Sequence, residues 1–287
     1  MSFQHYTRSF KIGSAIRSQN NEPIEIDHLR KVVPSIFATE AHSSRSDRFA
    51  PVPTIDVLAG LQREGFEVFH AVQARTRDAG RAEFTKHMLR LRHRGIENGA
   101  GQAFEIVLVN ANDGTSAYQM IPGFFRMVCA NGMICGDTFG EVKVRHSGRA
   151  IDDVVEGAYR VLDDAPRVTD QVSRFRSINL NEGERLALAT AAHELRFEAR
   201  EGSQVPIAAD RLLHTRRTED RQSDLWTAFN VVQENVIRGG LTGFVRDGNN
   251  RQRRATTREV GGIDQSRALN RALWTLTERM AELKSAA

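Results

Sequence analysis

The stretch "FTKHMLRLRHR", residues 84–94, alternates between two kinds of side chain. Its odd positions are Thr85, His87, Leu89, Leu91 and His93. Its even positions combine Phe84 and Met88 with the cations Lys86, Arg90, Arg92 and Arg94. Successive side chains of a β-strand point to opposite faces. The pattern therefore predicts a strand whose odd face packs on a core and whose even face is a cationic ladder.

Two further strands are expected on either side of this one. In "FEVFHAVQAR" (66–75), one face would hold Phe66, Val68, His70, Val72 and Ala74. The run "AFEIVLVNA" (103–111) is apolar nearly throughout, as in a central strand. Asp-Ala-Gly and Asn-Gly-Ala-Gly occur between the runs and favour hairpin connections, so the three strands should be antiparallel.

The next segment, "NDGTSAYQMIPGFFRMVCANG" (112–132), predicts a helix. Thr115 or Ser116 would cap it, and Asn131-Gly132 would end it. The residues with helical spacing are Ile121, Phe124, Phe125 and Val128. Pro122 fits only if it lies in the first turn. "FGEVKVRHSG" (139–148) predicts one more strand.

These assignments predict an α+β fold with an antiparallel sheet, a β-β-β-α core and a helical C-terminal half. We expect an irregular N-terminal arm (1–50), a β-β-β-α-β core (51–150) and a mainly helical region (151–287) packed on the core as one domain. Helical patterns occur at 55–65, from 151 onward with a break at Pro166, at 180–197, at 223–240 and at 263–285. Residues 246–258 are expected to form an arginine-rich loop.

Composition narrows the class of protein. Among 287 residues, 40% are apolar and 26% are charged, which is ordinary for a globular chain. Two cysteines do not support a disulfide-stapled secreted fold. The N-terminal residues have no apolar core of the signal-peptide type, and no run approaches the roughly 20 apolar residues of a membrane span. We expect a cytoplasmic protein with no membrane association and no cofactor.

The positive charge is concentrated in two short segments. Residues 75–94 contain seven Lys or Arg and two acidic residues, and residues 246–258 contain five Arg and one Asp. The whole chain has a net charge of only +4, so the remainder is acidic. Local basic density favours a polyanion-binding site, because phosphate contacts release counterions. A solvated hairpin and a loop are the structural alternative.

The cationic ladder is the strongest chemical signal in the sequence. Same-face neighbours on a strand lie about 6.6 to 7 Å apart, a spacing similar to that of phosphates on an extended single strand. The predicted nucleic-acid-binding residues are Lys86, Arg90, Arg92, Arg94, Arg75, Phe69, Arg251, Arg253 and Arg254. Phe69 would supply a stacking surface, and the last three arginines would close over the strand. The alternative is an edge strand kept soluble by its charges.

Metal binding and catalysis have weaker support in the sequence. Cys129 and Cys135 have five residues between them, which is not the spacing of a structural zinc site, so we expect packing rather than metal binding there. The sequence contains none of the motifs GxSxG, HExxH, the P-loop or the Rossmann glycines, so no enzyme is expected. A metal-dependent nuclease using Asp113, Glu141 and His146 is the least supported option.

Four ordered segments carry a resemblance to a known family. They are "NANDGTSAYQMIPGFFRMVCANGM", "VKVRHSG", "DLWTAFNVVQENVIRGG" and "GIDQSRALNRALW", within roughly residues 50–285. They resemble the phage- and plasmid-borne family called domain of unknown function 932, which implies a mobile element but no chemistry. The predicted strand-strand-strand-helix order is also similar to ring-forming single-strand annealing proteins, a likeness at the level of the fold.

The resemblance and the basic ladder together predict an annealing-type protein of a phage or plasmid that binds single-stranded DNA in a basic groove, with RNA as an open alternative. Such a protein would be a homo-oligomer larger than a dimer, including the ring form. The alternative function is an interaction or anti-defence protein whose basic surface docks on a host protein.

Overall fold

Six strands form one antiparallel sheet in the computed structural model, which describes residues 15–18, 21–43, 52–76, 79–96, 101–126, 139–145, 149–197 and 204–286. Each strand pairs with the next along the chain: β1 (Ala15–Arg17), β2 (Phe66–Gln73), β3 (His87–His93), β4 (Gln102–Ala111), β5 (Ser116–Arg126) and β6 (Val142–Val144). A separate hairpin consists of β7 (Thr242–Arg246) and β8 (Gln252–Thr256).

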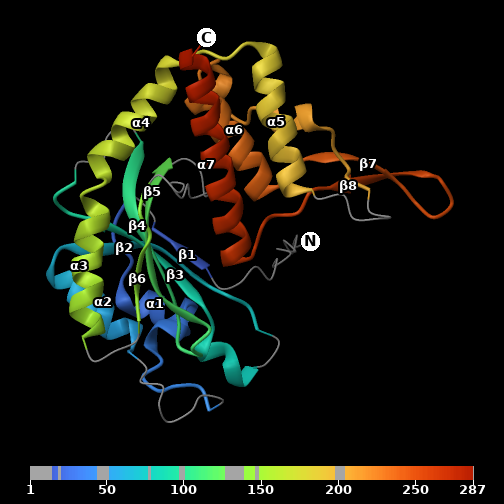
Figure 1. Ribbon diagram of the computed structural model, residues 1–287. Helices are drawn as coiled ribbons and strands as arrows, with labels where there is room; N and C mark the ends of the chain where they lie inside the picture. Colours follow the sequence, from blue (N-terminus) through green and yellow to red (C-terminus); the bar gives the residue numbers. More distant parts are fainter. Residues whose placement is uncertain are drawn as a thin grey trace, which may run out of the picture.

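The α-helices within these ranges are α1 (Ile26–Val32), α2 (Thr54–Arg63), α3 (Ala150–Leu162), α4 (Ala165–Ser177), α5 (Glu182–Arg196), α6 (Leu225–Arg238) and α7 (Ile263–Ala286). Short 3₁₀ helices span Pro34–Phe37, Ala79–Phe84, Ala209–Leu213 and Thr218–Arg221. Helices α2 and α3 lie against the sheet, α5, α6 and α7 form a second group, and α4 runs between them (Figure 1). The predicted α+β class, with helices in the C-terminal half, is confirmed.

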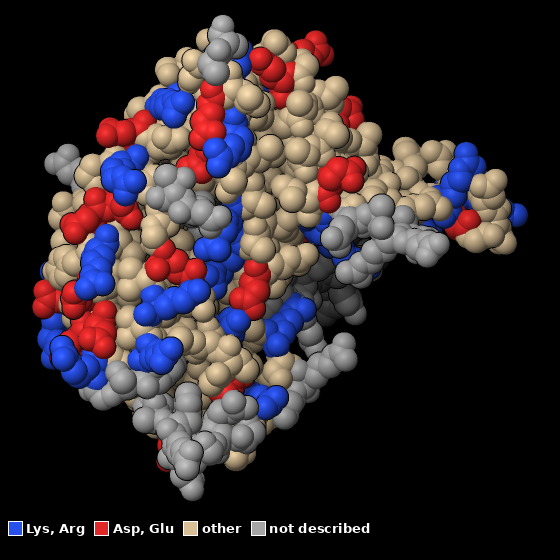
Figure 2. All heavy atoms as spheres, in the orientation of Figure 1, with Lys and Arg blue, Asp and Glu red and all other residues tan. Residues whose placement is uncertain are grey.

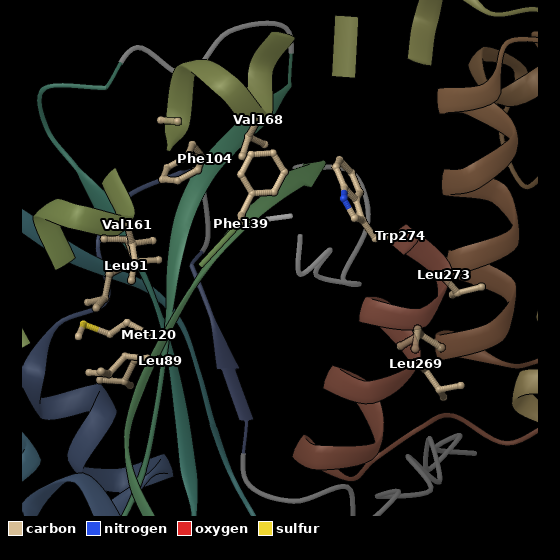
Figure 3. Close-up of a cluster of buried hydrophobic side chains, with 14 of the residues drawn as sticks. Leu89, Leu91, Phe104, Met120, Phe139, Val161, Val168, Leu269, Leu273 and Trp274 are labelled. Carbon is tan, nitrogen blue, oxygen red and sulfur yellow. The ribbon is translucent and has the colours of Figure 1, made fainter. Parts of the chain in front are cut away.

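One face of the sheet packs on α2 and α3. Leu89 and Leu91 are buried and extend from β3 toward these helices, together with Met120 of β5 (Figure 3). The predicted packing of the odd face of residues 84–94 is therefore confirmed for these leucines.

The opposite face of the sheet is also covered. Val107 and Val109 of β4 and Ile121 and Phe125 of β5 form a buried cluster with Ile263, the first residue of α7. Because both faces of the central strands are buried, their sequences are apolar at nearly every position instead of alternating.

The helix predicted after the third strand is wrong, because Ser116–Arg126 forms β5. Its apolar residues mimic helical spacing because they divide between two buried faces: Tyr118 and Met120 lie in the main core, whereas Ile121 and Phe125 lie in the second cluster. Pro122 pairs with Ile106 of β4 but lies beyond the residues that pair with β6, and among the described residues no second ladder is present there. Residues 127–132 lie outside the described part of the chain.

The predicted faces of β2 are correct only for its first half. The register with β3 shifts between Val68 and His70, so Phe69 is a bulge. Phe66 and Val68 are buried, as predicted. Beyond the bulge, the buried residues are Ala71 and Gln73 instead of the predicted His70 and Val72.

Three further expectations need correction. Residues 84–94 do not form an edge strand, because β3 lies between β2 and β4. The arginine-rich segment 246–258 is not an irregular loop, since most of it belongs to the β7–β8 hairpin, which projects from the body of the molecule (Figure 1). The strand predicted at 139–148 is shorter, spanning Val142–Val144.

Candidate nucleic-acid interface

Arg90 and Arg92 lie on the face of β3 that points away from α2 and α3. On the neighbouring strand, β4, the same face carries Glu105. The Arg90 Nε donates to Glu105 Oε2, and the Arg92 Nε donates to Glu105 Oε1 at 2.7 Å. The Glu105 side chain is 0% exposed, and those of Arg90 and Arg92 are 3% and 10% exposed. One buried carboxylate thus holds two buried guanidiniums.

Aromatic rings complete the environment of both arginines. The Arg90 guanidinium lies 3.4 Å from the centre of the Phe125 ring, and that of Arg92 lies 3.9 Å from the Phe69 ring. The Arg92 Nη1 also donates to Asn21 Oδ1. The Phe69 ring, predicted to stack on bases, therefore has Arg92 against its face.

The expectation of a solvent-exposed ladder is wrong for its two central members. A phosphate backbone cannot lie along Arg90 and Arg92 while they are buried. Lys86, at one end of β3, pairs with Asp264 of α7 at 2.7 Å. At the other end, the Arg94 side chain is 69% exposed and pairs with Glu67 at 3.2 Å. Arg75 is exposed beside the Lys86 end, so the length of β3 separates it from Arg94.

The β7–β8 hairpin has a different character. Phe244 pairs directly with Arg254 across the two strands, and Arg246 pairs with Gln252. Because alternate residues share a face, Phe244, Arg246 and Arg254 lie on one side, and Arg253 lies on the other. Phe244 is 60% exposed, and all the arginines from 246 to 254 are exposed.

The turn between the two strands is organised by Asp247. Its carboxylate accepts hydrogen bonds from the amides of Asn249 and Arg251, both at 2.9 Å. Asn250 has φ of 61°, a conformation that asparagine tolerates well. The acidic side chain in this segment thus bonds within the turn. Arg246 donates to the carbonyl and the side chain of Asn250, at 3.2 and 3.1 Å, whereas Arg251, Arg253 and Arg254 face solvent.

Strand β7 is attached to segment 204–206 from its middle to the end next to the turn. The Phe244 amide donates to the Pro206 carbonyl at 3.0 Å, and Gln204 bonds the backbone of Arg246 in both directions. Gly243 permits this approach, since a Cβ there would lie 1.7 Å from the Pro206 oxygen. The anchoring fixes the direction in which the hairpin projects.

The surface charges support this distinction between the two basic runs. On the face of the body that Figure 2 shows, Lys and Arg are interspersed with Asp and Glu, whereas the charged side chains of the hairpin are mainly basic. Within the described residues, no salt bridge involves Arg251, Arg253 or Arg254. Of the predicted site residues, these three together with Arg75 and Arg94 are exposed.

Comparison with known proteins identifies the family. The family described as Domain of unknown function (DUF932) matches residues 41–274. The chain belongs to this family. It is 46% identical over 270 residues to the UPF0380 protein YafZ of Escherichia coli (strain K12), covering 94% of this chain and 96% of the relative. The UPF0380 protein YfjQ of the same organism is similar to the same extent.

No solved structure matches the DUF932 chain, so the likeness to ring-forming annealing proteins has no support from structural comparison. The order strand, strand, strand, helix on which that likeness rested is also absent, because β5 takes the place of the helix. Among the described residues, no helix is long and apolar enough to cross a membrane.

The nuclease candidates do not come together in the described part of the DUF932 chain. Asp113 accepts hydrogen bonds from the amide and hydroxyl of Thr115, at 2.9 and 2.6 Å. Glu141 pairs with Arg267 at 3.1 Å and Arg271 at 3.4 Å. No group of three or more His, Cys, Asp or Glu that could hold a metal occurs in those ranges. Cys129, Cys135 and His146 lie outside them.

A Thr-His pair is the arrangement in the described residues that most resembles catalytic machinery. The His87 Nδ1 lies 3.3 Å from the Thr85 carbonyl, which can only accept, so the Nε2 accepts from the Thr54 hydroxyl at 2.9 Å. The Asn110 amide donates to the same hydroxyl at 3.0 Å. Burial lowers the pKa of His87 to about 4.

This polar cluster is closed to solvent. Thr54 and Asn110 are 0% exposed and His87 is 1% exposed, so no substrate can reach the hydroxyl. The cluster instead joins the start of α2 to β3 and β4. His87, on the face of the strand that was predicted to pack, is thus a buried residue with a hydrogen-bond partner on each ring nitrogen.

Sequence reasoning missed Glu105 and Phe244. Glu105 lies in a strand of apolar residues, and a lone acid at such a position signals a buried cationic partner. Phe244 precedes an Asp-Gly turn within "TGFVRDGNNRQRRAT", and Asp-Gly between alternating residues is a hairpin signal.

Proposed function

We propose that this protein binds single-stranded DNA through the β7–β8 hairpin, as an annealing-type protein of a mobile element. The observation that carries the proposal is the exposed aromatic ring of Phe244 among exposed arginines on a projecting, rigidly anchored hairpin. The contact surface is therefore the second basic run and not the buried ladder.

The chemistry of this face suits a flexible, unpaired strand. Phe244 can stack on a base, and stacking on an aromatic side chain is worth about 1 to 3 kcal/mol per base. Arg246 and Arg254 flank the ring and can bind the phosphates on either side of that base. Bases in a duplex are already stacked on one another, so the ring favours single strands.

A second candidate is docking on an acidic host protein. Its support is the outer edge of β8, which pairs only with β7 among the described residues. An exposed edge can accept a strand from a partner. This mode depends on backbone groups and charge and makes no use of base stacking.

A titration with a labelled 30-nucleotide single strand at two salt concentrations tests the proposal. We expect Phe244→Ala to weaken binding about tenfold, and Arg251, Arg253 and Arg254 changed together to Gln to flatten the dependence of log affinity on log salt by about 2. The matched control changes three exposed helical arginines, Arg160, Arg176 and Arg279, to Gln. Equal affinity and slope for wild type and the hairpin variants would overturn the proposal.

The annealing activity needs its own measurement. We expect wild-type protein to accelerate pairing of two complementary labelled strands without nucleotide, and Phe244→Ala to lose most of that acceleration. DNA binding without any acceleration would exclude the annealing function and leave a single-strand-binding protein.

A further inference from the structure

A hollow lies between helices α2 and α3, on the side of the molecule away from the hairpin (Figure 1). Its volume is about 360 Å³. The residues that line it come from the end of α2 and the first half of α3, and they include Arg63, Glu64, Ile151, Asp152, Val155 and Glu156. Ligand pockets have volumes of about 300 to 1,000 Å³, so the α2–α3 hollow is large enough for a side chain of a partner.

The floor of the α2–α3 hollow is apolar. It consists of Ile151 and Val155, which are both half-buried. One turn further along α3, Tyr159 is 37% exposed, and its hydroxyl donates to Glu64 Oε2 at 3.0 Å. An aromatic side chain inserted into the hollow would remove this apolar surface from water.

The rim of the hollow is acidic. Glu64, Asp152 and Glu156 are all exposed around it. The nearby cations are Arg63, in the lining, and Arg160, which pairs with Glu156. Asp152 has no salt bridge with another described residue. The carboxylates outnumber the guanidiniums, so the surface suits a cationic partner that also carries an apolar side chain.

The β7–β8 hairpin has the complementary properties. Phe244 is 60% exposed, and residues 242–256 contain four arginines and one aspartate. The hairpin and the α2–α3 hollow lie on opposite sides of the molecule (Figure 1). The hydrogen bonds of β7 to segment 204–206 hold the hairpin in that direction. It therefore cannot reach the hollow of its own chain, but it can reach that of another copy.

We infer that the hairpin of one copy docks in the α2–α3 hollow of a second copy. Phe244 covers the apolar floor, and the hairpin arginines face the carboxylates of the rim. Charge complementarity selects this occupant. Pairing of β8 with β8 of another copy is disfavoured, because it would bring the arginines of two copies together. The inference does not require DNA binding, although a DNA strand would compete with the hollow for the same hairpin.

This contact joins two different surfaces. A head-to-tail contact repeats from copy to copy and forms a ring or an open filament, whereas a contact between identical surfaces stops at a dimer. The inference therefore predicts assemblies larger than a dimer in the absence of DNA.

Light scattering of the DNA-free protein tests this at low salt, where exposed charges are least screened. We expect wild type to form species larger than a dimer at micromolar concentrations. Changing Asp152 and Glu156 together to Lys should raise the dissociation constant more than about tenfold, because like charges then face the arginines. The control changes Asp170 and Glu194, exposed acids of α4 and α5, to Lys and should associate like wild type. A monomeric wild type, or equal association of wild type and the Asp152/Glu156 variant, would overturn the inference.

Mixing two variants identifies both surfaces. The Asp152/Glu156 variant keeps its hairpin, and the variant with Arg251, Arg253 and Arg254 changed to Gln keeps its hollow. We expect each to be monomeric alone and an equimolar mixture to form dimers. Growth stops there, because the remaining hollow and the remaining hairpin of each dimer are the altered ones. A mixture that stays monomeric, or that grows beyond dimers, would contradict the head-to-tail contact.

DNA binding is measured separately with the labelled single strand. The Asp152/Glu156 variant should bind it at least as tightly as the Asp170/Glu194 control, because its hairpin is intact and the two variants have the same net charge. A wild type that binds the strand but does not self-associate without DNA would overturn this inference and keep the proposed function. Self-association without DNA binding would do the reverse.

Discussion

At the scale of single residues, Glu105 determines the buried environment of Arg90 and Arg92. Its carboxylate draws Arg90 and Arg92 into the sheet, where each guanidinium also lies on an aromatic ring. Desolvation lowers the pKa of Arg90, and the attraction of Glu105 opposes that shift. The three side chains form a fixed internal unit that joins β3 to β4.

The first prediction concerns this unit. Replacing Glu105 with Gln leaves two buried guanidiniums without a counter-charge, and we expect a loss of about 3 to 5 kcal/mol in the free energy of unfolding. The control is Glu67→Gln, because its partner Arg94 is 69% exposed and such a pair contributes less than about 1 kcal/mol. Urea denaturation measures both. Similar losses in the two variants would show that Arg90 and Arg92 do not depend on Glu105.

The second prediction concerns pH and His87. The unfolded chain binds a proton on this imidazole near pH 6.5, but the folded protein does so only near pH 4. Between those values the unfolded state holds more protons, so the free energy of unfolding falls as the pH falls. Between pH 7 and pH 4.5, the titration of this histidine lowers the free energy of unfolding by about 2 kcal/mol.

Urea unfolding of His87→Gln at pH 7 and pH 4.5 checks this. We expect the difference between the two pH values to shrink by that amount, because glutamine does not titrate. The exposed His28→Gln is the control and should leave the difference unchanged. An equal pH dependence in wild type and His87→Gln would contradict the low pKa.

Single residues also show which features of the fold could be predicted from the sequence. Alternation placed Leu89 and Leu91 in the core correctly, because period two depends only on the strand. The same alternation could not reveal whether the opposite face meets water. That depends on Glu105, which lies 15 positions from Arg90, and on α7, whose Asp264 lies 178 positions from Lys86. A cationic ladder and a buried ion-pair row are identical in sequence until those partners are known.

At the scale of elements, β5 shows why a local pattern can mislead. Tyr118 and Met120 face one cluster and Ile121 and Phe125 face the other, so no single-face period remains in the sequence. Helices α3, α4, α5 and α7 were predictable because each exposes one side to solvent and keeps its 3.6-residue stripe, whereas α6 is buried at nearly every position. The hairpin was treated as a loop because its strands bury little apolar surface.

The third prediction concerns how the hairpin is held. Replacing Gly243 with Ala sets a Cβ against the Pro206 carbonyl, so β7 must separate from segment 204–206. We expect trypsin to cleave after the hairpin arginines several times faster than in wild type. Gly248→Ala at the turn is the matched control, since nothing lies within 4 Å of a Cβ there. Equal cleavage rates in the two variants would mean that the close contact does not anchor the hairpin.

At the scale of the whole molecule, the fold separates the two basic runs. Glu105, Glu67 and Asp264 pair with the first run, whereas the second projects into solvent. Net charge alone, at +4, could not distinguish these arrangements. Long-range attraction to a polyanion should therefore depend on the hairpin far more than on β3.

The edges of the main sheet limit how copies of the chain can associate. In the described part of the chain its edges are β1 and β6, each of three residues. Such short edges offer few backbone groups to another copy, so pairing of sheets is a poor route to an oligomer. The hairpin strands have five residues each and extend about 17 Å, much less than a long oligonucleotide. In the proposed binding mode, several copies can therefore occupy one strand of DNA.

The fourth prediction follows from this difference in length. We expect complexes larger than a dimer on a 60-nucleotide single strand and fewer copies on a 15-nucleotide strand, measured by light scattering. A closed ring would instead give the same number of copies on both strands, so the experiment also separates the two forms of homo-oligomer. The triple variant of Arg251, Arg253 and Arg254 should not assemble on either strand, because each copy is recruited through its hairpin. A monomer at every micromolar concentration, with and without DNA, would contradict the annealing function, since annealing by this route requires copies side by side on one strand.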